Sequence, residues 1–221
     1  VTVSVASNPS WLTLTAKAGG RISTITKAYG LLGPDNNVKA TESLNGLITD
    51  VAVDSDGNFY YSDQSYNVIN KIDANGNLTI FAGTSEAGYS GDGGAATSAK
   101  LNKPTGLAFD SNGNLLIAEF GNHVIRKVDT NGNISTFAGT GTEGYSGDGG
   151  AATSAKLNSS EYIIYYNNNF YIADYGNMRV RKIDFEGIIT TIAGSDIYHG
   201  DNISASTARI NLPRNMAMDK N

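Results

Sequence analysis

A stretch of 15 residues occurs twice in this chain without a single change. It reads GYSGDGGAATSAKLN at 88–102 and again at 144–158. Both copies lead into related continuations that end at Gly139 and Gly194, and a weaker upstream copy ends at Gly83, so the period is 56 and then 55 residues. A fixed period of this kind indicates a repeat architecture, in which every unit must take the same shape.

The two ends of the chain fit the same frame. Residues 1–29 align with the later part of a unit, with Gly20 over Gly132, and only the first strand is missing. The C-terminal LPRNMAMDKN matches the start of a unit, KPTGLAFDSN, and so supplies that strand. The sequence therefore predicts one domain over 1–221, with repeats at about 30–83, 84–139 and 140–194 and a composite unit made of 1–29 and 213–221.

Each unit contains four short β-type runs separated by turns. In the clearest copy the runs are 106–110, 115–119, 124–129 and 134–138, and Asn-Gly pairs stand in two of the turns. Asn-Gly is typical of tight hairpins because both residues tolerate positive φ. The third run carries Arg126 and Lys127, so we expect it nearer solvent than the first two, which are almost wholly apolar. Four-stranded antiparallel meanders at a fixed period predict an all-β fold, a β-propeller.

Two segments carry a family resemblance, NLLIAEFGNHVIRKVDTNG at 114–132 and NFYIADYGNMRVRKIDFEG at 169–187. They resemble the NHL repeat, as found in bacterial NHL arrays and in the NHL propeller of teneurins. The matching positions are Asp174, Asn177, Arg179, Val180, Asp184 and Gly187 in one unit, and Glu119, Asn122, Val124, Ile125, Asp129 and Gly132 in the other. The earlier unit departs by placing Tyr66 where Asn is usual. The resemblance implies four-stranded blades, usually six to a ring.

Four units leave the number of blades open. If the strand expected at 215–219 pairs with the one expected at 2–6, both chain ends lock one blade and the ring closes with four blades, which removes free strand edges. Alternatively, the chain is a segment of a larger propeller, or two chains pool their blades.

Composition narrows the class of partner. The net charge of −5 and the pI near 4.9 argue against nucleic acid or an anionic membrane, although a basic cluster lies on the third runs: Arg126, Lys127, Arg179, Arg181 and Lys182. We expect that cluster to form a solvated outer face. The chain has no apolar run long enough to span a bilayer and nothing at Val1 that resembles a signal peptide.

Two further features bear on the compartment. Cysteine is absent, which excludes disulfides and thiolate chemistry. Four sequons, at Asn77, Asn133, Asn158 and Asn202, favour an extracellular or cell-surface setting, but a chain so rich in Asn, Ser and Thr also produces sequons by chance.

The long connections between units are the most distinctive candidate surface. They span 83–104, 139–158, 194–213 and, more loosely, 30–44, and a propeller would gather them on one face. Asp92, Asp148 and Asp201, with Asp35 as a counterpart, could form an acidic ring near the channel mouth and bind calcium through carboxylate oxygens. The favoured alternative is that each Asp caps the turn written AATSAKL or organises its own loop.

Three tyrosines precede those aspartates by three residues each: Tyr89, Tyr145 and Tyr198. Exposed, they would offer a peptide or a sugar large amphipathic rings, and buried, they would hold the loop flat. Catalysis has little support, because the two histidines, His123 and His199, stand in different kinds of loop.

The sequence thus favours a non-enzymatic NHL β-propeller that binds a protein or a glycan through its loop face, with binding residues Tyr89, Asp92, Tyr145, Asp148, Tyr198 and Asp201. No catalytic residue, metal ligand or cofactor is assigned. One alternative is a structural protein that self-associates as a homo-oligomer. Another is a metal-dependent hydrolase or lyase with its site on the propeller axis.

Overall fold

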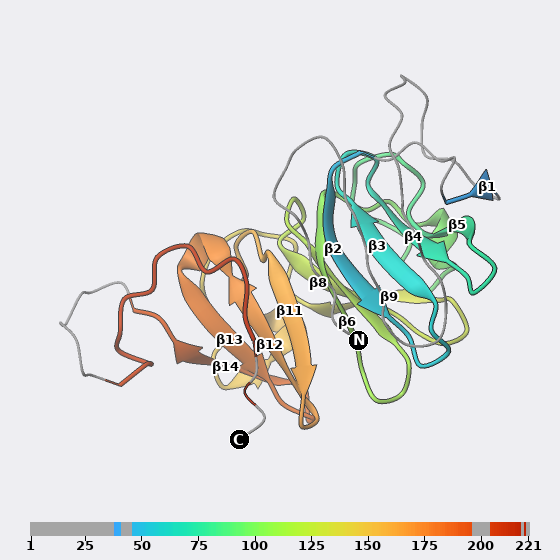
Figure 1. Ribbon diagram of the computed structural model, residues 1–221. Helices are drawn as coiled ribbons and strands as arrows, with labels where there is room; N and C mark the ends of the chain where they lie inside the picture. Colours follow the sequence, from blue (N-terminus) through green and yellow to red (C-terminus); the bar gives the residue numbers. More distant parts are fainter. Residues whose placement is uncertain (1–37, 41–45, 196–203, 218, 220–221) are drawn as a thin grey trace.

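The computed structural model describes residues 38–40, 46–195, 204–217 and 219, and it contains three antiparallel sheets of the same plan (Figure 1). Each sheet is a meander of four consecutive strands, confirming the all-β prediction. The strands of the first sheet are β2 (Ile48–Val53), β3 (Phe59–Asp63), β4 (Val68–Ile72) and β5 (Asn77–Ala82). Those of the second are β6 (Pro104–Phe109), β7 (Leu115–Glu119), β8 (Val124–Val128) and β9 (Ile134–Ala138). Those of the third are β11 (Tyr162–Tyr166), β12 (Asn169–Asp174), β13 (Arg179–Ile183) and β14 (Ile188–Ala193).

Shorter elements belong to the connections. Strand β1 (Val38–Lys39) pairs with the outer edge of β5, and β10 (Gly150–Ala151) pairs with the outer edge of β14. Two 3₁₀ turns, η1 (Ala96–Ser98) and η2 (Ala152–Ser154), lie in the repeated AATSAKL segments, and a third, η3 (Tyr175–Asn177), follows β12. The connection that precedes a sheet therefore reaches that sheet's outer edge before it enters the first strand.

The hairpin turns explain why the strand boundaries are so regular. In the turn after β6, Oδ1 of Asp110 accepts hydrogen bonds from the backbone N–H groups of Asn112 and Asn114, each at 2.9 Å. Gly113 takes a φ of +82°, which disfavours a residue with a Cβ atom. Aspartates at 54, 73, 129 and 184 make the same pair of backbone contacts in their turns. Local chemistry thus fixes each turn.

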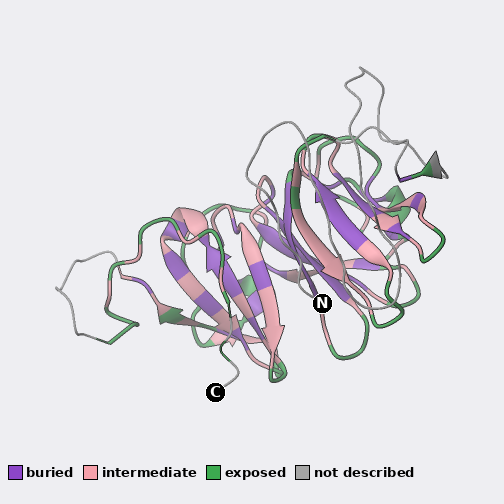
Figure 2. Cartoon of the chain, in the orientation of Figure 1, coloured by how far each residue is buried: buried purple, intermediate pink, exposed green. Residues whose placement is uncertain are grey.

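The core lies between the sheets, and the connections take part in it (Figure 2). Between the first and second sheets, the apolar side chains of β4, β7 and β9 pack around Ala96, Ala99 and Leu101 of the connection. Ala152, Ala155 and Leu157 take the same places between the second and third sheets. The repeated connection is therefore a wedge between neighbouring sheets, whereas the sequence predicted that it would cross one face of the ring.

Of the other sequence predictions, some are confirmed by the structure, one is wrong and one is not tested by the described residues. The four runs whose limits were predicted, 106–110, 115–119, 124–129 and 134–138, are strands within two residues of those limits. The prediction that the third strand of each unit lies nearer solvent is wrong for its arginines, because Arg126 in β8 and Arg181 in β13 are fully buried. The composite unit of 1–29 and 213–221 lies mostly outside the described residues, and residues 204–217 contain no strand, so closure of that blade stays a prediction. Among the described residues no helix is long and apolar enough to cross a membrane.

Candidate functional site

The two buried arginines lie beside a bulge in the outer strand of their sheets. The β8–β9 pairing shifts register between Ile125 and Arg126, and the β13–β14 pairing shifts at the equivalent step between Val180 and Arg181. The extra residue of this bulge lies in the outer strand, Phe137 in β9 and Ile192 in β14, whereas β8 pairs with β7 and β13 with β12 without a shift. Both guanidinium groups point towards the preceding connection, with which they form hydrogen bonds.

Arg126 holds the connection that precedes its own sheet. Its Nη2 atom pairs with Oδ1 of Asp92 and donates to the carbonyl of Ser90 at 3.1 Å, while Nη1 lies 3.2 Å from Oε1 of Glu119. The other oxygen of Asp92 accepts the backbone N–H of Thr136 at 3.0 Å. We call this arrangement of Asp92, Arg126 and Glu119 the first clasp.

The second clasp repeats the arrangement one unit later with Asp148, Arg181 and Asp174. Nη2 of Arg181 lies 2.7 Å from Oδ1 of Asp148, and Nη1 lies 3.3 Å from Oδ2 of Asp174. Asp174 and Arg181 are fully buried, whereas the Asp148 side chain is 37% exposed. Each clasp therefore joins a buried ion pair to one carboxylate at the surface.

Two further contacts fasten the same connection. The carboxylate of Glu119 accepts the backbone N–H of Asn102 at 2.8 Å, and Asp174 accepts that of Asn158 at the same distance. The amides of Asn122 and Asn177 donate to the carbonyls of Gly88 and Gly144, each at 2.7 Å. The acidic, Asn and Arg positions of the repeat thus share one task, which is to hold the connection.

Desolvation by burial has the largest effect on the pKa of the two inner carboxylates, Glu119 and Asp174. It raises the pKa of Glu119 to about 7, because desolvation outweighs the attraction of Arg126. The pKa of Asp174 is raised for the same reason. Asp148 behaves in the opposite way: burial would raise its pKa, but hydrogen bonds from Thr191 and the charge of Arg181 lower it. Asp148 therefore stays ionised at neutral pH.

A tyrosine lies over each clasp. The ring of Tyr89 has the Arg126 guanidinium 5.2 Å from its centroid, and its hydroxyl bonds the hydroxyl of Thr136 at 2.6 Å. The hydroxyl of Tyr145 bonds Asp148 and Thr191, each at 3.0 Å. The two tyrosines are 45% and 43% exposed, so each ring is held at one side and open to solvent at the other.

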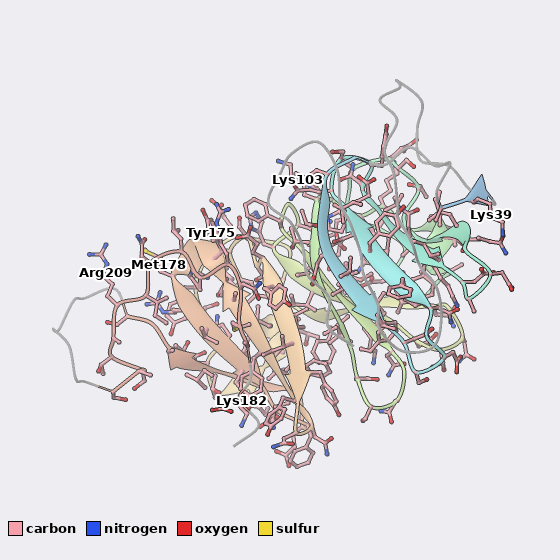
Figure 3. The ribbon with its side chains drawn as sticks, in the orientation of Figure 1. Lys39, Lys103, Tyr175, Met178, Lys182 and Arg209 are labelled. Atoms are coloured by element: carbon pink, nitrogen blue, oxygen red, sulfur yellow. The ribbon has the colours of Figure 1, made fainter. Side chains whose placement is uncertain are left out.

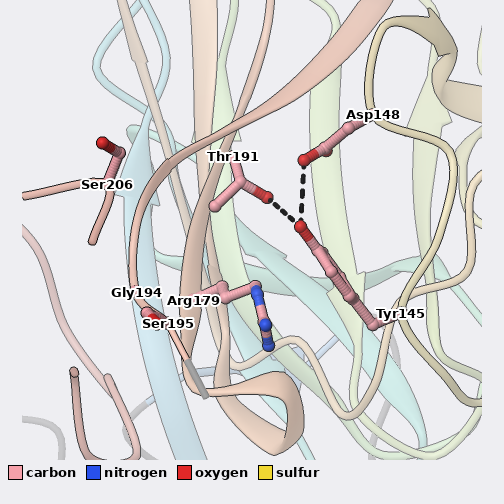
Figure 4. A pocket seen from close by; sticks show the side chains of 7 residues that line it. All are labelled: Tyr145, Asp148, Arg179, Thr191, Gly194, Ser195 and Ser206. Carbon is pink, nitrogen blue, oxygen red and sulfur yellow. Dashed lines mark hydrogen bonds between the residues drawn. The ribbon is translucent and has the colours of Figure 1, made fainter. Parts of the chain in front are cut away.

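The second clasp borders a shallow hollow of about 360 Å³ (Figure 4). Its lining is mostly polar and consists of Tyr145, Asp148, Arg179, Thr191, Gly194, Ser195 and Ser206. Arg179 places its guanidinium carbon 3.8 Å from the Tyr145 ring centroid, a distance typical of cation–π contact. The equivalent position of the second sheet is Val124. The hollow is therefore a place where the near-identical units differ chemically.

The described residues of the first sheet and its connection form no clasp of this kind. Asn70 stands where the later units have Arg126 and Arg181, and no described residue forms a hydrogen bond with its buried Oδ1. Asp63 still fastens the preceding connection, because its Oδ2 atom accepts the backbone N–H of Gly46 at 2.7 Å. The second and third units thus share an arginine with a loop aspartate 34 or 33 residues earlier, whereas the first unit has no arginine at this position.

A second polar group lies along the first strands of the sheets. Asp50 of β2 accepts the backbone N–H of Leu107 in β6 at 2.8 Å, which ties the first sheet to the second. Burial raises the pKa of Asp50 to about 6. Gly106 is required here, because a Cβ atom at this position would lie 2.7 Å from Cα of Tyr162. The inner strands therefore approach each other closely, with one carboxylate bonded between them.

The predicted site residues are only partly brought together. Tyr89 and Asp92 form part of the first clasp and Tyr145 and Asp148 part of the second, so the described aspartates do not meet in an acidic ring. Neither aspartate caps η1 or η2. Asp35, Tyr198, His199 and Asp201 lie outside the described residues. Nδ1 of His123 accepts the backbone N–H of Ser159 at 2.9 Å, a structural contact.

In the described part of the chain, no group of three or more His, Cys, Asp or Glu side chains is placed to hold a metal ion. The basic cluster is divided between environments. Arg126, Arg179 and Arg181 are buried, whereas Lys127 and Lys182 are partly exposed at the strand surface. Figure 3 shows Lys182 and Tyr175 at opposite ends of the third sheet. The arginines therefore do not form the solvated face that the sequence predicted.

Comparison with known proteins agrees with these repeats. Residues 83–144 match the family model described as the teneurin NHL domain. Human teneurin-4 is 38% identical over 102 residues, which cover 40% of this chain and 4% of that protein. Protein SUPPRESSOR OF QUENCHING 1, chloroplastic, from Arabidopsis thaliana is 31% identical over 119 residues, covering 52% of this chain and 11% of that protein. The chain thus spans about a tenth or less of these curated relatives.

Among solved structures, an auxiliary nutrient binding protein from Bacteroides ovatus superposes with a TM-score of 0.58. The sequences are 23% identical, and the match covers 78% of this chain and 44% of that one. At this identity the likeness concerns the fold alone. It supports the arrangement of repeated four-stranded sheets as β-propeller blades.

Proposed function

We propose that this chain, whose repeats are of the NHL type, is a non-enzymatic β-propeller scaffold that binds a protein or a glycan through the exposed side of its connections. The observation that carries the proposal is the Tyr145 ring, 43% exposed beside the polar hollow and held by Asp148, Thr191 and Arg179. A fixed aromatic ring offers contact area with little further loss of conformational entropy on binding. Tyr89 offers a second, simpler ring one unit earlier.

The contacts of Asp92 and Asp148 support a binding role over a catalytic one. The carboxylates of Asp92 and Asp148 each accept charged hydrogen bonds from an arginine, and Asp92 also accepts a backbone N–H. A general acid or base needs a proton that it can exchange with substrate, whereas these groups stabilise a loop. In our proposal they are binding-surface residues that also hold the connection.

The wider setting follows from the same repeats. We propose that the four units comprise the three described sheets and a composite blade of 1–29 with 213–221, within an extracellular or cell-surface protein. The teneurin match supports the repeat type, and the exposed sequon at Asn133 is compatible with an extracellular setting. Secretion of the chain from a eukaryotic cell, followed by mass measurement of glycopeptides containing Asn133, tests the setting.

The binding proposal is tested with arrays of glycans and of synthetic peptides. The full chain is compared with Tyr145→Ala, and with Phe185→Ala as the control, because Phe185 is an aromatic residue 79% exposed on a turn away from the hollow. We expect Tyr145→Ala to lower the affinity for a specific ligand at least tenfold, or by about 1.4 kcal/mol, and the control variant to leave that affinity unchanged. Equal binding by a folded Tyr145→Ala protein would refute the assignment.

Self-association is the alternative that a specific observation favours. Apolar side chains remain open to solvent at Leu47, Ile192 and Leu212, at 55%, 37% and 43%. A native mass spectrum recorded over a range of protein concentrations separates the alternatives. A homo-oligomer whose contacts depend on these side chains would favour the structural assembly over the binding scaffold.

A further inference from the structure

The polar hollow beside the second clasp has the wrong lining for an apolar ligand. Pockets that bind apolar small molecules are lined mainly by hydrophobic side chains. Here the polar groups are a carboxylate, a guanidinium and hydroxyls, contributed by Asp148, Arg179, Thr191 and Ser206. A ligand that fits this lining must therefore offer hydrogen-bond donors and acceptors over most of its surface.

One aromatic ring is the exception to this polar lining. Tyr145 is 43% exposed, and Figure 4 shows its hydroxyl bonded to both Asp148 and Thr191, each at 3.0 Å. The guanidinium carbon of Arg179 lies 3.8 Å from the ring centroid. The ring is therefore held in place and gives a ligand one apolar contact beside several polar ones. Pyranose sugars match this combination, because C–H groups form their faces and hydroxyl groups their edges.

The charges at the hollow favour a neutral ligand. Burial raises the pKa of Asp148, but hydrogen bonds from Thr191 and the charge of Arg181 lower it by more, so the carboxylate is ionised at neutral pH. It repels an anionic ligand, and Arg179 repels a cationic one, whereas a neutral polyol is repelled by neither. A carboxylate can accept about four hydrogen bonds. Its described donors are the side chains of Arg181, Tyr145 and Thr191, which leaves acceptor capacity for a sugar hydroxyl.

A protein partner fits this hollow less well than a sugar does. The anchors of protein interfaces are large side chains, above all Trp, Tyr and Arg, in well-packed pockets from which water is excluded. A large apolar anchor would cover Asp148, Thr191 and Ser206 without pairing them, which costs free energy. A sugar hydroxyl both donates and accepts, so it can pair with a carboxylate as well as with a hydroxyl.

The equivalent place in the second unit is chemically different. Val124, which is fully buried, stands where the third unit has Arg179. The backbone of Gly141 lies against the ring of Tyr89, since a Cβ atom on this glycine would be 3.0 Å from Cε1 of the ring. Tyr89 is nevertheless 45% exposed, almost the same as Tyr145. The two tyrosines are therefore a matched pair in different surroundings.

We infer that the polar hollow is a saccharide site that takes one neutral pyranose unit of a glycan. C–H groups of the sugar pack on the exposed part of the Tyr145 ring, and Asp148 and Ser206 form hydrogen bonds with its hydroxyls. The volume of about 360 Å³ is near the lower end for ligand pockets, which suits a single sugar unit. This assignment rests on the proposed function, because it requires the connections to form a binding surface.

Calorimetric titration of the full chain with neutral and acidic glycans tests the assignment. The probes are neutral oligosaccharides selected on a glycan array, together with counterparts that carry a uronate or a sulfate group. We expect the acidic counterparts to bind about tenfold more weakly or worse. Tyr145→Ala should lower the affinity for the neutral probe by about tenfold or more, and so should Arg179→Val, which copies the second unit.

Two further variants locate the site. Phe185→Ala is the control, because this residue is exposed on a turn outside the hollow, and it should keep the wild-type affinity. Tyr89→Ala should lose less affinity than Tyr145→Ala. Far-UV circular dichroism confirms that each variant is folded. If Tyr145→Ala does not fold, Arg179→Val takes its place, and the comparison of neutral with acidic probes needs no variant.

Each outcome decides between the alternatives. Acidic glycans that bind as tightly as neutral ones, or a loss in Tyr89→Ala as large as in Tyr145→Ala, overturn the assignment. Binding of peptides alone, abolished by Tyr145→Ala, overturns the saccharide site and leaves the proposed binding function intact. Binding of neither glycans nor peptides overturns both.

Discussion

Removing the surface carboxylate of the second clasp should destabilise the protein in a way that depends on Arg181. Asp148→Ala deletes a charged hydrogen bond of 2.7 Å to a guanidinium group with no exposure of its own. Breaking a fully buried pair costs about 3–5 kcal/mol. Here the carboxylate is 37% exposed and Arg181 keeps Asp174, so we expect a loss of about 2 kcal/mol in the free energy of unfolding.

A double-mutant cycle separates the ion pair from other effects of the substitution. The proteins are wild type, Asp148→Ala, Arg181→Met and the double variant, each unfolded in urea at pH 7 and followed by far-UV circular dichroism. We expect a coupling energy of about 1–2 kcal/mol, because residues in one hydrogen-bonded network are not additive. Asp92→Ala in the first clasp is the matched comparison and should lose a similar amount.

The outcome that contradicts this reasoning is equally clear. A coupling energy below about 0.5 kcal/mol would mean that Asp148 and Arg181 contribute independently, as exposed ion pairs commonly do. The ion pair would then form because the connection already lies there, and it would not hold the connection in place.

Three further predictions concern the inner strands and calcium. Burial raises the pKa of Asp50 from 3.8 to about 6, so between these pH values the folded state binds more protons than the unfolded state. Asp50 therefore lowers the free energy of unfolding by up to about 3 kcal/mol as the pH rises from about 4 to 6. Asp50→Asn should make this fall smaller, as measured by urea unfolding at several pH values. Gly106→Ala should destabilise by about 2 kcal/mol or more, because its Cβ would meet the backbone of Tyr162, whereas Gly94→Ala, with 3.4 Å to its nearest atom, should stay near wild type in the same unfolding assay. Adding calcium or EDTA should leave the melting temperature unchanged, since both described clasp aspartates are already bound to arginine, and a calcium-dependent rise would restore the metal alternative.

The strands could be predicted from the sequence because their limits are set locally. An aspartate three residues before a glycine, as Asp110 stands to Gly113, bonds the N–H groups of its own turn whatever the rest of the chain does. The register of each hairpin follows from that turn. This is why runs chosen from turn residues agree with the observed strands.

The interior role of Arg126 could not be predicted from strand composition. A charged residue on a strand is normally exposed, and the burial of Arg126 depends on Asp92, 34 residues earlier. The place of the connection was missed for a related reason. Ala96, Ala99 and Leu101 are small or common apolar residues, and only the neighbouring sheets make them core.

The clasps also decide which stretch of chain is a transferable module. Each connection is bonded to the sheet that follows it, through Asp92 and Arg126 in one case and Asp148 and Arg181 in the next. A gene duplication that copied only the strands would deliver a buried guanidinium without its carboxylate. A duplication that begins after Gly83 and ends at Gly139, both with positive φ, copies the carboxylate of Asp92 and the guanidinium of Arg126 together. Protein engineers who wish to lengthen or shorten the array should therefore cut at these glycines.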